Sequence, residues 1–313
     1  MGGGVGTVAM PAHAPRPGPD DPLDLHGVIP PTVTAFDDDE TLDPEGTAEH
    51  ARFVVDRGVH GVFPLGTNGE FALLSADERD RVVEAVVDEV GGEAPVIAGV
   101  GEPSTRETVE RARAAADAGA DGVVVVTPYY FPIDREGAIE HYRRVTDAVS
   151  VPVYVYHIPG RTGNAFDRET LDGIAALDGI AGVKDSSKDV PWLGRAIDDH
   201  PELTFLSGSD SLLFPGLSLG CSGMISAVAN AFPELVVECY EAFDEGDVER
   251  SRTLQSRIYH VREAIKRGPY MAGVKASLAL RGFDAGPLRS PLRALDEEER
   301  NLVERDLVAL DLL

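Results

Sequence analysis

Apolar runs of four to six residues alternate with segments of helical periodicity from Gly27 onward. The runs are continuous rather than alternating, which is typical of strands in a parallel sheet that helices cover. Ser75 and Ser104 each stand three residues before a glutamate, and this spacing predicts capping boxes at two helix N-termini. The eight predicted strands are Val28–Thr34, Gly61–Pro64, Pro95–Val100, Gly122–Val126, Pro152–Tyr156, Ile180–Val183, Leu203–Leu206 and Ser222–Ser226.

An internal repeat supports this division. The pattern Gly-x-x-Gly followed by an apolar residue joins a helix end to a new strand at Gly58–Val62, Gly119–Val123, Gly179–Val183 and Gly220–Met224. The first three copies lie about 60 residues apart, which corresponds to two βα units of about 30 residues. We therefore predict a (β/α)8 TIM barrel over residues 25–243 and a C-terminal helical extension over residues 244–313.

An open, doubly wound sheet is the alternative architecture. It would require a glycine-rich phosphate loop after the first strand, and none is present. The segment Gly99-Val100-Gly101 follows the third strand and lacks the third glycine, so a dinucleotide site is not expected there.

The composition narrows the possible partners. The chain has 54 Asp and Glu against 28 Lys and Arg, and the resulting formal charge of -26 is spread along the sequence. Such a surface repels phosphates, so we expect neither nucleic acid nor an anionic membrane as a partner. Abundant acid with scarce lysine favours a cytoplasm of high salt, where counterions screen the self-repulsion. No apolar run of about 18 residues is available to span a bilayer.

The N-terminal residues 1–24 are rich in Gly, Ala and Pro, and we predict a disordered leader. They contain no basic segment followed by a long apolar one, so the sequence does not indicate a secretion signal. Cys221 and Cys239 fall in an apolar strand and a helix without metal-ligand spacing. We interpret both cysteines as core residues of a cytoplasmic protein.

Lys184 is the first candidate for chemistry because it follows the apolar strand Ile180–Val183. An amine in apolar surroundings loses part of its preference for the charged form and can attack a carbonyl carbon. Tyr156, at the end of the preceding strand, would be its acid–base partner. The alternative is a solvated lysine at the start of a loop. Lysine is rare here, however, and otherwise occurs only at Lys188, Lys266 and Lys275.

The other strand ends add candidates, because active residues of such barrels lie at the carboxyl ends of the strands. Gly66–Glu70 follows the second strand, Thr127–Tyr130 the fourth, and Arg161 the fifth. We expect these side chains to share one mouth with Lys184. They show no His, Asp and Glu cluster with metal spacing, so we expect neither a metal nor another cofactor.

Four motifs at these strand ends resemble the dihydrodipicolinate synthase and N-acetylneuraminate lyase family of class I Schiff-base aldolases. They are Gly66-Thr67-Asn68-Gly69-Glu70, Pro128-Tyr129-Tyr130, the pattern Tyr-x-x-Pro-x-Arg-Thr-Gly from Tyr156 to Gly163, and Gly182-Val183-Lys184-Asp185. The resemblance extends from about Gly27 to the C-terminus. Each motif is weak alone, but the four in this order are specific.

The resemblance implies a mechanism. Lys184 would form a Schiff base with pyruvate or another 2-oxo acid, and Tyr156 would move the protons with Thr67 as a relay. Tyr130 would complete this chain of hydroxyls by reaching into the neighbouring subunit, as it does in relatives. The amides of Thr67 and Asn68 would hold the carboxylate of the 2-oxo acid.

The resemblance also implies that Gly208 and Ile225 line the site and that Arg161 binds the second substrate. The expected assembly is a homo-oligomer, either a dimer or a tetramer of two tight dimers.

Several of the singled-out residues have simpler interpretations. Tyr129 and Tyr154 can be packing residues, and Thr67 with Asn68 can form an ordinary turn. We expect His157 to hydrogen-bond locally. The acidic run Asp37–Glu40 is interpreted as a solvated turn rather than a cation site.

The exact substrate is not settled by the motifs. Arg161 resembles the synthases, in which an arginine clamps a carboxylate. Departures from the synthases resemble lyases that act on 2-oxo-3-deoxy sugar acids; they are Asn68, His157, Asp185–Ser187 and Gly268–Met271.

Our leading hypothesis is an aldolase that cleaves a 2-keto-3-deoxy sugar acid such as 2-keto-3-deoxygluconate. The alternatives are a dehydratase of the same acids, a dihydrodipicolinate synthase that condenses pyruvate with aspartate semialdehyde, and a non-catalytic protein that binds a 2-oxo acid and regulates a partner.

Overall fold

The computed structural model describes residue 23 and residues 25–313. The predicted leader, residues 1–24, lies outside the described residues except for Leu23. None of the helices in the described part of the chain is long and apolar enough to cross a membrane.

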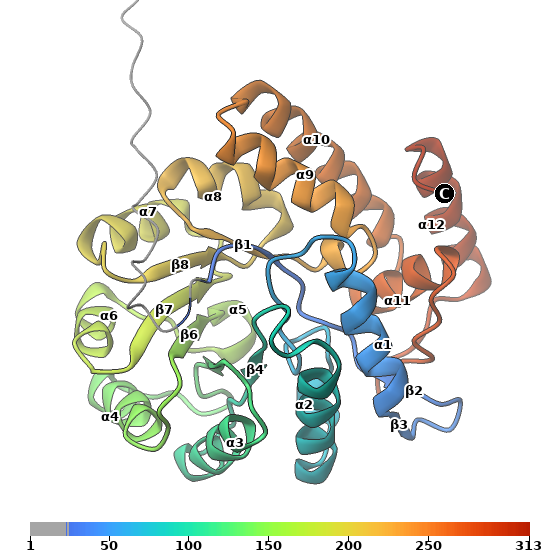
Figure 1. Ribbon diagram of the computed structural model, residues 1–313. Helices are drawn as coiled ribbons and strands as arrows, with labels where there is room; N and C mark the ends of the chain where they lie inside the picture. The colour runs from blue at the N-terminus through green and yellow to red at the C-terminus, as the bar shows by residue number, and fades with distance from the viewer. Residues whose placement is uncertain (1–22, 24) are drawn as a thin grey trace, which may run out of the picture.

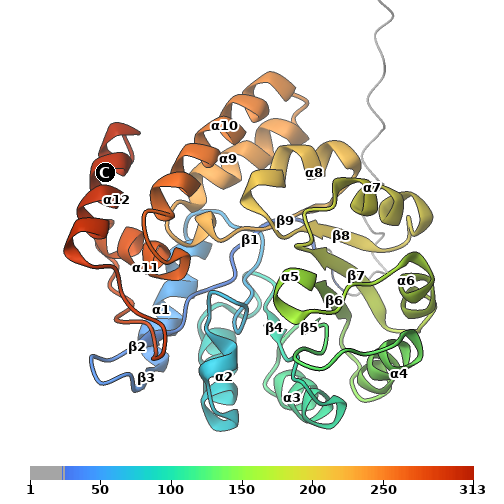
Figure 2. The same ribbon diagram turned by 180° about the vertical axis from the view of Figure 1, so that it is seen from behind.

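Parallel strands form the centre of the molecule, and helices surround them (Figures 1 and 2). The seven-stranded sheet has the order β1-β9-β8-β7-β6-β5-β4. Its first strand along the chain, β1, therefore pairs with its last strand, β9. This arrangement confirms the predicted (β/α)8 barrel. The strands are β1 (Gly27–Ile29), β4 (Ile97–Gly99), β5 (Gly122–Val126), β6 (Val153–His157), β7 (Ile180–Asp185), β8 (Thr204–Ser207) and β9 (Gly223–Ile225).

The predicted second strand, Gly61–Pro64, is reduced to one parallel bridge between Val62 and Val96. It still closes the ring, because Phe63 N donates to Pro30 O at 3.0 Å and Ile97 N donates to Val62 O at 3.0 Å. The pairing with β4 continues as far as Pro64, whose O accepts from Gly99 N at 3.0 Å, but proline has no backbone N–H to donate in return.

The first predicted strand also ends early, at Ile29, because Pro30 and Pro31 lack donors. An antiparallel pair that was not predicted follows, β2 (Ala35–Phe36) with β3 (Leu42–Asp43). The acidic run Asp37–Glu40 is the turn between them, and its three aspartates are exposed. The prediction of a solvated turn is confirmed.

Helices form the outer layer, and the C-terminal ones lie together on one side (Figures 1 and 2). The outer ring consists of α1 (Pro44–Val55), α2 (Ala76–Val90), α3 (Thr105–Asp117), α4 (Arg135–Thr146), α6 (Arg168–Ala175), α7 (Val190–Asp199), α8 (Leu213–Leu219) and α9 (Pro233–Asp244), with the single turn α5 (Pro159–Thr162). Beyond it lie α10 (Val248–Ile265), α11 (Tyr270–Leu280) and α12 (Glu297–Ala309). We propose that the barrel ends at residue 243 and that the C-terminal helical extension begins at residue 244.

The two predicted capping boxes differ. At α2, Ser75 accepts from Glu78 N while the Glu78 carboxylate accepts from Ser75 N, so this box is confirmed. At α3, Ser104 accepts from Glu107 N, but the Glu107 carboxylate binds the Ser104 hydroxyl at 2.8 Å instead of the backbone amide. Only half of the second box forms.

The barrel interior is filled by a cluster of its own, separate from the layers between strands and helices. Tyr154 is buried in this interior cluster, as predicted for a core residue. Cys221 and Cys239 are buried free thiols in the outer layers, which confirms their interpretation as core residues. The interior cluster consists of Leu25, Ile29, Phe63, Ile97, Val124, Val126, Tyr154, Tyr156, Leu206 and Ile225.

Candidate active site

Lys184 lies near the carboxyl end of β7, in register with Tyr156 of β6. Its side-chain amine is 3.2 Å from the centre of the Tyr156 ring and 3.2 Å from Ser186 Oγ. The residue is only 4% exposed. Burial lowers the pKa of Lys184, and the nearby Tyr156 and Asp185 oppose this without cancelling it. The amine is therefore more available as a nucleophile than that of a solvated lysine.

Tyr156 connects Lys184 to the loop after the closing strand. Its hydroxyl is 3.3 Å from Thr67 Oγ1, and its ring meets Phe63 edge to face. Burial raises the pKa of Tyr156, but the Lys184 charge and hydrogen bonds with Lys184, Thr67 and Ser186 lower it overall. Amine, phenol and hydroxyl thus form one contiguous path along which protons can move.

The loop Gly66–Glu70 turns tightly, since Gly69 N donates to Gly66 O at 3.1 Å. Thr67 and Asn68 therefore lie in a turn, as the simpler interpretation required. Among the described residues, nothing accepts a hydrogen bond from the backbone amides of Thr67 and Asn68. The Asn68 side-chain amide is buried without a partner in the described structure. These donors could bind an anion.

A cavity of about 440 Å³ opens at the carboxyl ends of the strands. Seven of the eight predicted site residues line it: Thr67, Asn68, Tyr156, Arg161, Lys184, Gly208 and Ile225. The eighth, Tyr130, does not. Its side chain is 84% exposed and packs against Phe131, with ring centroids 4.9 Å apart. Within one chain, Tyr130 is not brought to Thr67.

The family model for the "Dihydrodipicolinate synthetase family" matches residues 24–310. The chain belongs to this family. The resemblance drawn from the four motifs is confirmed, and the protein is a lyase.

Two curated relatives within the family illustrate its range of names. A protein of Halobacterium salinarum named "Uncharacterized DapA-like lyase" is 70% identical over 97% of this chain and 100% of its own. The 4-hydroxy-tetrahydrodipicolinate synthase of Methanopyrus kandleri is 42% identical over 92% of this chain and 97% of its own.

Solved structures of the family agree with the fold. YagE of Escherichia coli K12, solved in complex with pyruvate, superposes with a TM-score of 0.88 at 33% identity and covers 92% of this chain and 99% of its own. Dihydrodipicolinate synthase of Thermotoga maritima gives the same TM-score of 0.88, identity of 33% and coverage of 92% and 99%.

Gly208 follows β8 and leaves room for the amine. A Cβ at this position would collide with Ser186 Oγ and lie 3.2 Å from Lys184 Nζ. Ser186 Oγ in turn donates to Gly208 O at 3.2 Å. The lysine, the serine and the glycine are packed as one unit, in which no side chain fits at residue 208 without displacing the other two.

Several residues that line this cavity were not predicted as site residues from the sequence. Asp210 follows β8, so the strand-end rule could have found it. Its carboxylate accepts from Ser226 Oγ at 2.6 Å and from Tyr270 OH at 2.9 Å, and it lies 3.9 Å from Arg262 Nε. Burial, followed by the Asp210 charge, raises the pKa of Tyr270. Arg262 and Tyr270 come from α10 and α11, which the rule does not cover.

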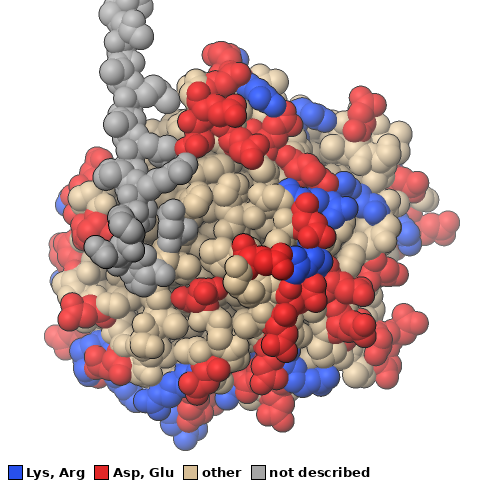
Figure 3. All heavy atoms as spheres, viewed as in Figure 1, with Lys and Arg blue, Asp and Glu red and all other residues tan. Residues whose placement is uncertain are grey.

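The cavity differs in charge from the chain as a whole. Acidic side chains spread widely over the face in Figure 3, in keeping with the formal charge of -26. The cavity wall instead carries one carboxylate, Asp210, and four cationic side chains, which are Arg161, Lys184, Lys188 and Arg262. The local field therefore favours an anionic ligand.

His157 hydrogen-bonds locally, as expected. Phe166 N donates to its Nε2 at 3.2 Å, so Nδ1 carries the proton and donates to Asp185 Oδ1 at 2.8 Å. The ring stacks on Phe166 and lies 4.5 Å from the ring of Trp192. The buried His157 ring therefore fixes the side chain of Asp185, the residue after Lys184, through this hydrogen bond.

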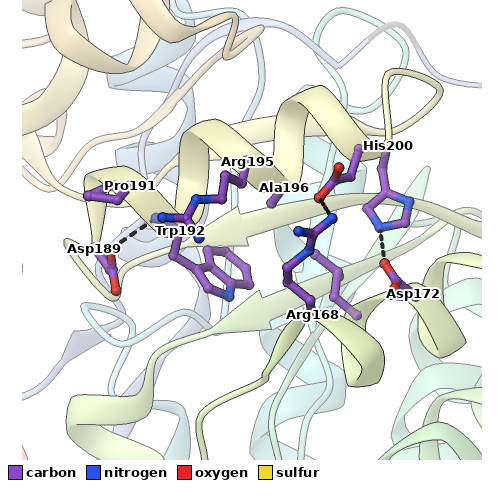
Figure 4. A pocket seen from close by; sticks show the side chains of 10 residues that line it. Arg168, Asp172, Asp189, Pro191, Trp192, Arg195, Ala196 and His200 are labelled. Atoms are coloured by element: carbon purple, nitrogen blue, oxygen red, sulfur yellow. Dashed lines mark hydrogen bonds and ion pairs between the residues drawn. The ribbon is translucent and has the colours of Figure 1, made fainter.

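A second, smaller pocket of about 160 Å³ lies between α6 and α7 (Figure 4). Its wall is held by the ion pair of Arg168 with Asp199 at 2.6 Å and by the hydrogen bond between His200 Nε2 and Asp172 Oδ1 at 3.0 Å. It shares no lining residue with the Lys184 cavity. In the described part of the chain, no group of three or more His, Cys, Asp and Glu residues could hold a metal ion.

Proposed function

We propose that this lyase acts on 2-oxo acids through a Schiff base, and that its substrate is a 2-keto-3-deoxy sugar acid such as 2-keto-3-deoxygluconate. The observation that carries the proposal is the buried amine of Lys184, whose pKa is lowered, in direct contact with Tyr156. The pyruvate complex of YagE supports the choice of a 2-oxo acid.

The reaction follows from these positions. The Lys184 amine attacks the C2 ketone, and loss of water leaves an iminium. The phenolic oxygen of Tyr156 takes the proton of the C4 hydroxyl, the C3–C4 bond breaks, and its electron pair moves to the iminium to give an enamine. The aldehyde leaves. Protonation of the enamine at C3 and hydrolysis then release pyruvate and free the amine.

The remaining groups orient the substrate. The amides of Thr67 and Asn68 hold its carboxylate. Arg161 binds the distal half, and Gly208 and Ile225 shape the wall. Tyr130 completes the hydroxyl chain from the neighbouring copy of a dimer or tetramer, which agrees with its 84% exposure in one chain. The protein works in the cytoplasm.

A dihydrodipicolinate synthase is the second candidate. Arg161 lines the cavity as a clamp for the carboxylate of aspartate semialdehyde would require, and the Methanopyrus kandleri relative carries the name of this enzyme. A dehydratase of sugar acids would start from the same iminium.

The first experiment is intact mass spectrometry after incubation with pyruvate and borohydride. We expect one covalent adduct of reduced pyruvate, which is absent in Lys184→Ala and retained in the matched control Lys266→Ala, an exposed lysine outside the cavity. Absence of the adduct in the folded wild type would overturn the mechanism and favour a non-catalytic protein that binds 2-oxo acids.

Steady-state assays then separate the substrates. We expect cleavage of 2-keto-3-deoxygluconate to exceed condensation of pyruvate with aspartate semialdehyde. The reverse order of kcat/KM would assign the protein to the synthases instead.

A further inference from the structure

Glu70 is the last residue of the loop that carries Thr67 and Asn68, and its side chain is completely buried. Its carboxylate lies 3.2 Å from Lys275 Nζ, and the exposed fractions of the two side chains are 0% and 6%. The same carboxylate accepts a hydrogen bond from Arg289 N at 2.9 Å. A buried ion pair therefore joins this loop to the C-terminal helices.

The ammonium of Lys275, in α11, also meets two backbone acceptors. Apart from its ion pair with Glu70, it donates to Pro287 O at 2.6 Å and to Ala285 O at 3.4 Å, and it lies 4.7 Å from the centre of the Phe36 ring. A compact amine with three donors fits this arrangement, whereas a planar guanidinium does not. This requirement explains a lysine at this position in a chain that otherwise relies on arginine.

The pair also holds an unfavourable backbone conformation. Glu70 has φ 55° and ψ 28°, which is the left-handed region that side chains other than glycine rarely adopt. Such a conformation persists only where its surroundings fix it. A second anchor is next to it, because Thr34 Oγ1 donates to Gly69 O at 2.7 Å.

Neither Glu70 nor Lys275 lines the cavity that contains Lys184. Any effect on the reaction must therefore pass through the loop. The residues that the loop presents to the cavity are Thr67 and Asn68.

We infer that Glu70 and Lys275 are positioning residues, which fix the amides of Thr67 and Asn68 for the carboxylate of the 2-oxo acid. This inference rests on the proposed function. It assigns to the C-terminal helices a direct part in substrate binding, because Lys275 reaches the loop from α11.

The test measures the pyruvate concentration that half-saturates borohydride trapping at Lys184 in the full-length protein. For Glu70→Gln, which keeps the size of the side chain, we expect half-saturation to rise about tenfold, as expected when one well-placed hydrogen bond to the carboxylate is lost. The trapping rate at saturating pyruvate should change little, because Lys184 and Tyr156 are untouched.

Three further variants address a purely structural role. Lys275→Met leaves a buried carboxylate unpaired and can prevent folding, whereas Glu70→Gln combined with Lys275→Met removes both charges. The double variant should fold and still show the raised half-saturation. Thr34→Val, which removes the second anchor, should shift it in the same direction. The control is Lys266→Met, an exposed lysine.

The outcomes are distinct. Unchanged half-saturation in folded Glu70→Gln and in the double variant would overturn the inference while leaving the proposed function intact. An absent adduct in the wild type would instead overturn the proposed function, and this inference with it.

Discussion

Gly208 leaves no free space for a side chain beside Lys184. A methyl group at this position collides with Ser186 Oγ and presses on the amine. We expect Gly208→Ala to slow pyruvate trapping about a hundredfold, because a displacement of about 1 Å at a reacting group can cost that much. The rate of borohydride trapping checks this.

The matched control is the double variant Gly208→Ala with Ser186→Ala. It removes the hydroxyl that the new methyl group meets first, so part of the lost rate should return. A wild-type rate in Gly208→Ala alone would contradict the packing described for this site.

Residues at the ends of strands were predictable from the sequence. Lys184, Tyr156 and Thr67 each follow an apolar run, and the barrel brings such ends together. Arg262 carries no comparable signal, and Tyr270 stood out only as part of the departure Gly268–Met271. Both lie on helices, and the sequence does not show where those helices pack. The exposure of the Tyr130 side chain could not be predicted from the sequence either, because it depends on the conformation of the loop after β5.

At the scale of elements, the contact between α2 and the C-terminal loop is open to a stability test. Glu78 caps α2 and binds the Arg289 guanidinium at 2.8 and 2.9 Å. The hydrogen bond from Arg289 lowers the pKa of Glu78 from its ordinary 4.5 to about 2, against the effect of burial. Because the folded-state pKa lies below the unfolded one, this stabilisation is complete above pH 4.5 and is lost as the pH falls toward 2.

We expect Glu78→Gln to reduce the free energy of unfolding at neutral pH by about 2 kcal/mol, as is typical for a lost hydrogen bond between charged groups. The difference from the wild type should shrink on acidification. Denaturant titrations across the pH range measure it. Glu107→Gln is the control, because among the described residues the Glu107 carboxylate binds the Ser104 hydroxyl and not an arginine. An equal loss in both variants would exclude the Arg289 contact as the cause.

Strands and helices were predicted best where a long apolar run was next to a helix with recognisable capping residues. The second predicted strand forms only one regular bridge, because Pro64 can accept a hydrogen bond from Gly99 N but has no N–H to donate. The hairpin of β2 and β3 was missed because strands of two residues are too short to show a period. The capping box at Ser104 forms only in part because the Glu107 side chain adopts a rotamer that reaches the Ser104 hydroxyl instead of its backbone amide. The spacing of the two residues in the sequence does not predict this rotamer.

At the scale of the whole molecule, the charge of -26 sets the response to salt. Self-repulsion among so many carboxylates weakens the compact state, and dissolved ions screen it. We expect the melting temperature to rise steadily between about 0.1 M and about 2 M KCl, where the screening length falls from about 10 Å to below about 3 Å.

Thermal unfolding and activity followed in parallel would test this expectation. Equal stability and activity in dilute buffer and in molar KCl would exclude salt adaptation. Replacing KCl with an isosmotic neutral solute is the control, because it separates screening of charge from exclusion of the solute by the protein surface.

The uneven distribution of lysine has a practical consequence for labelling. Lys184 and Lys275 are buried, while Lys188 and Lys266 are exposed. An amine-directed reagent should therefore modify Lys188 and Lys266 before the other two side chains. Lys188 lines the cavity and Lys266 does not. The ratio of the two labelling rates would report ligand occupancy, with the protein supplying its own internal reference.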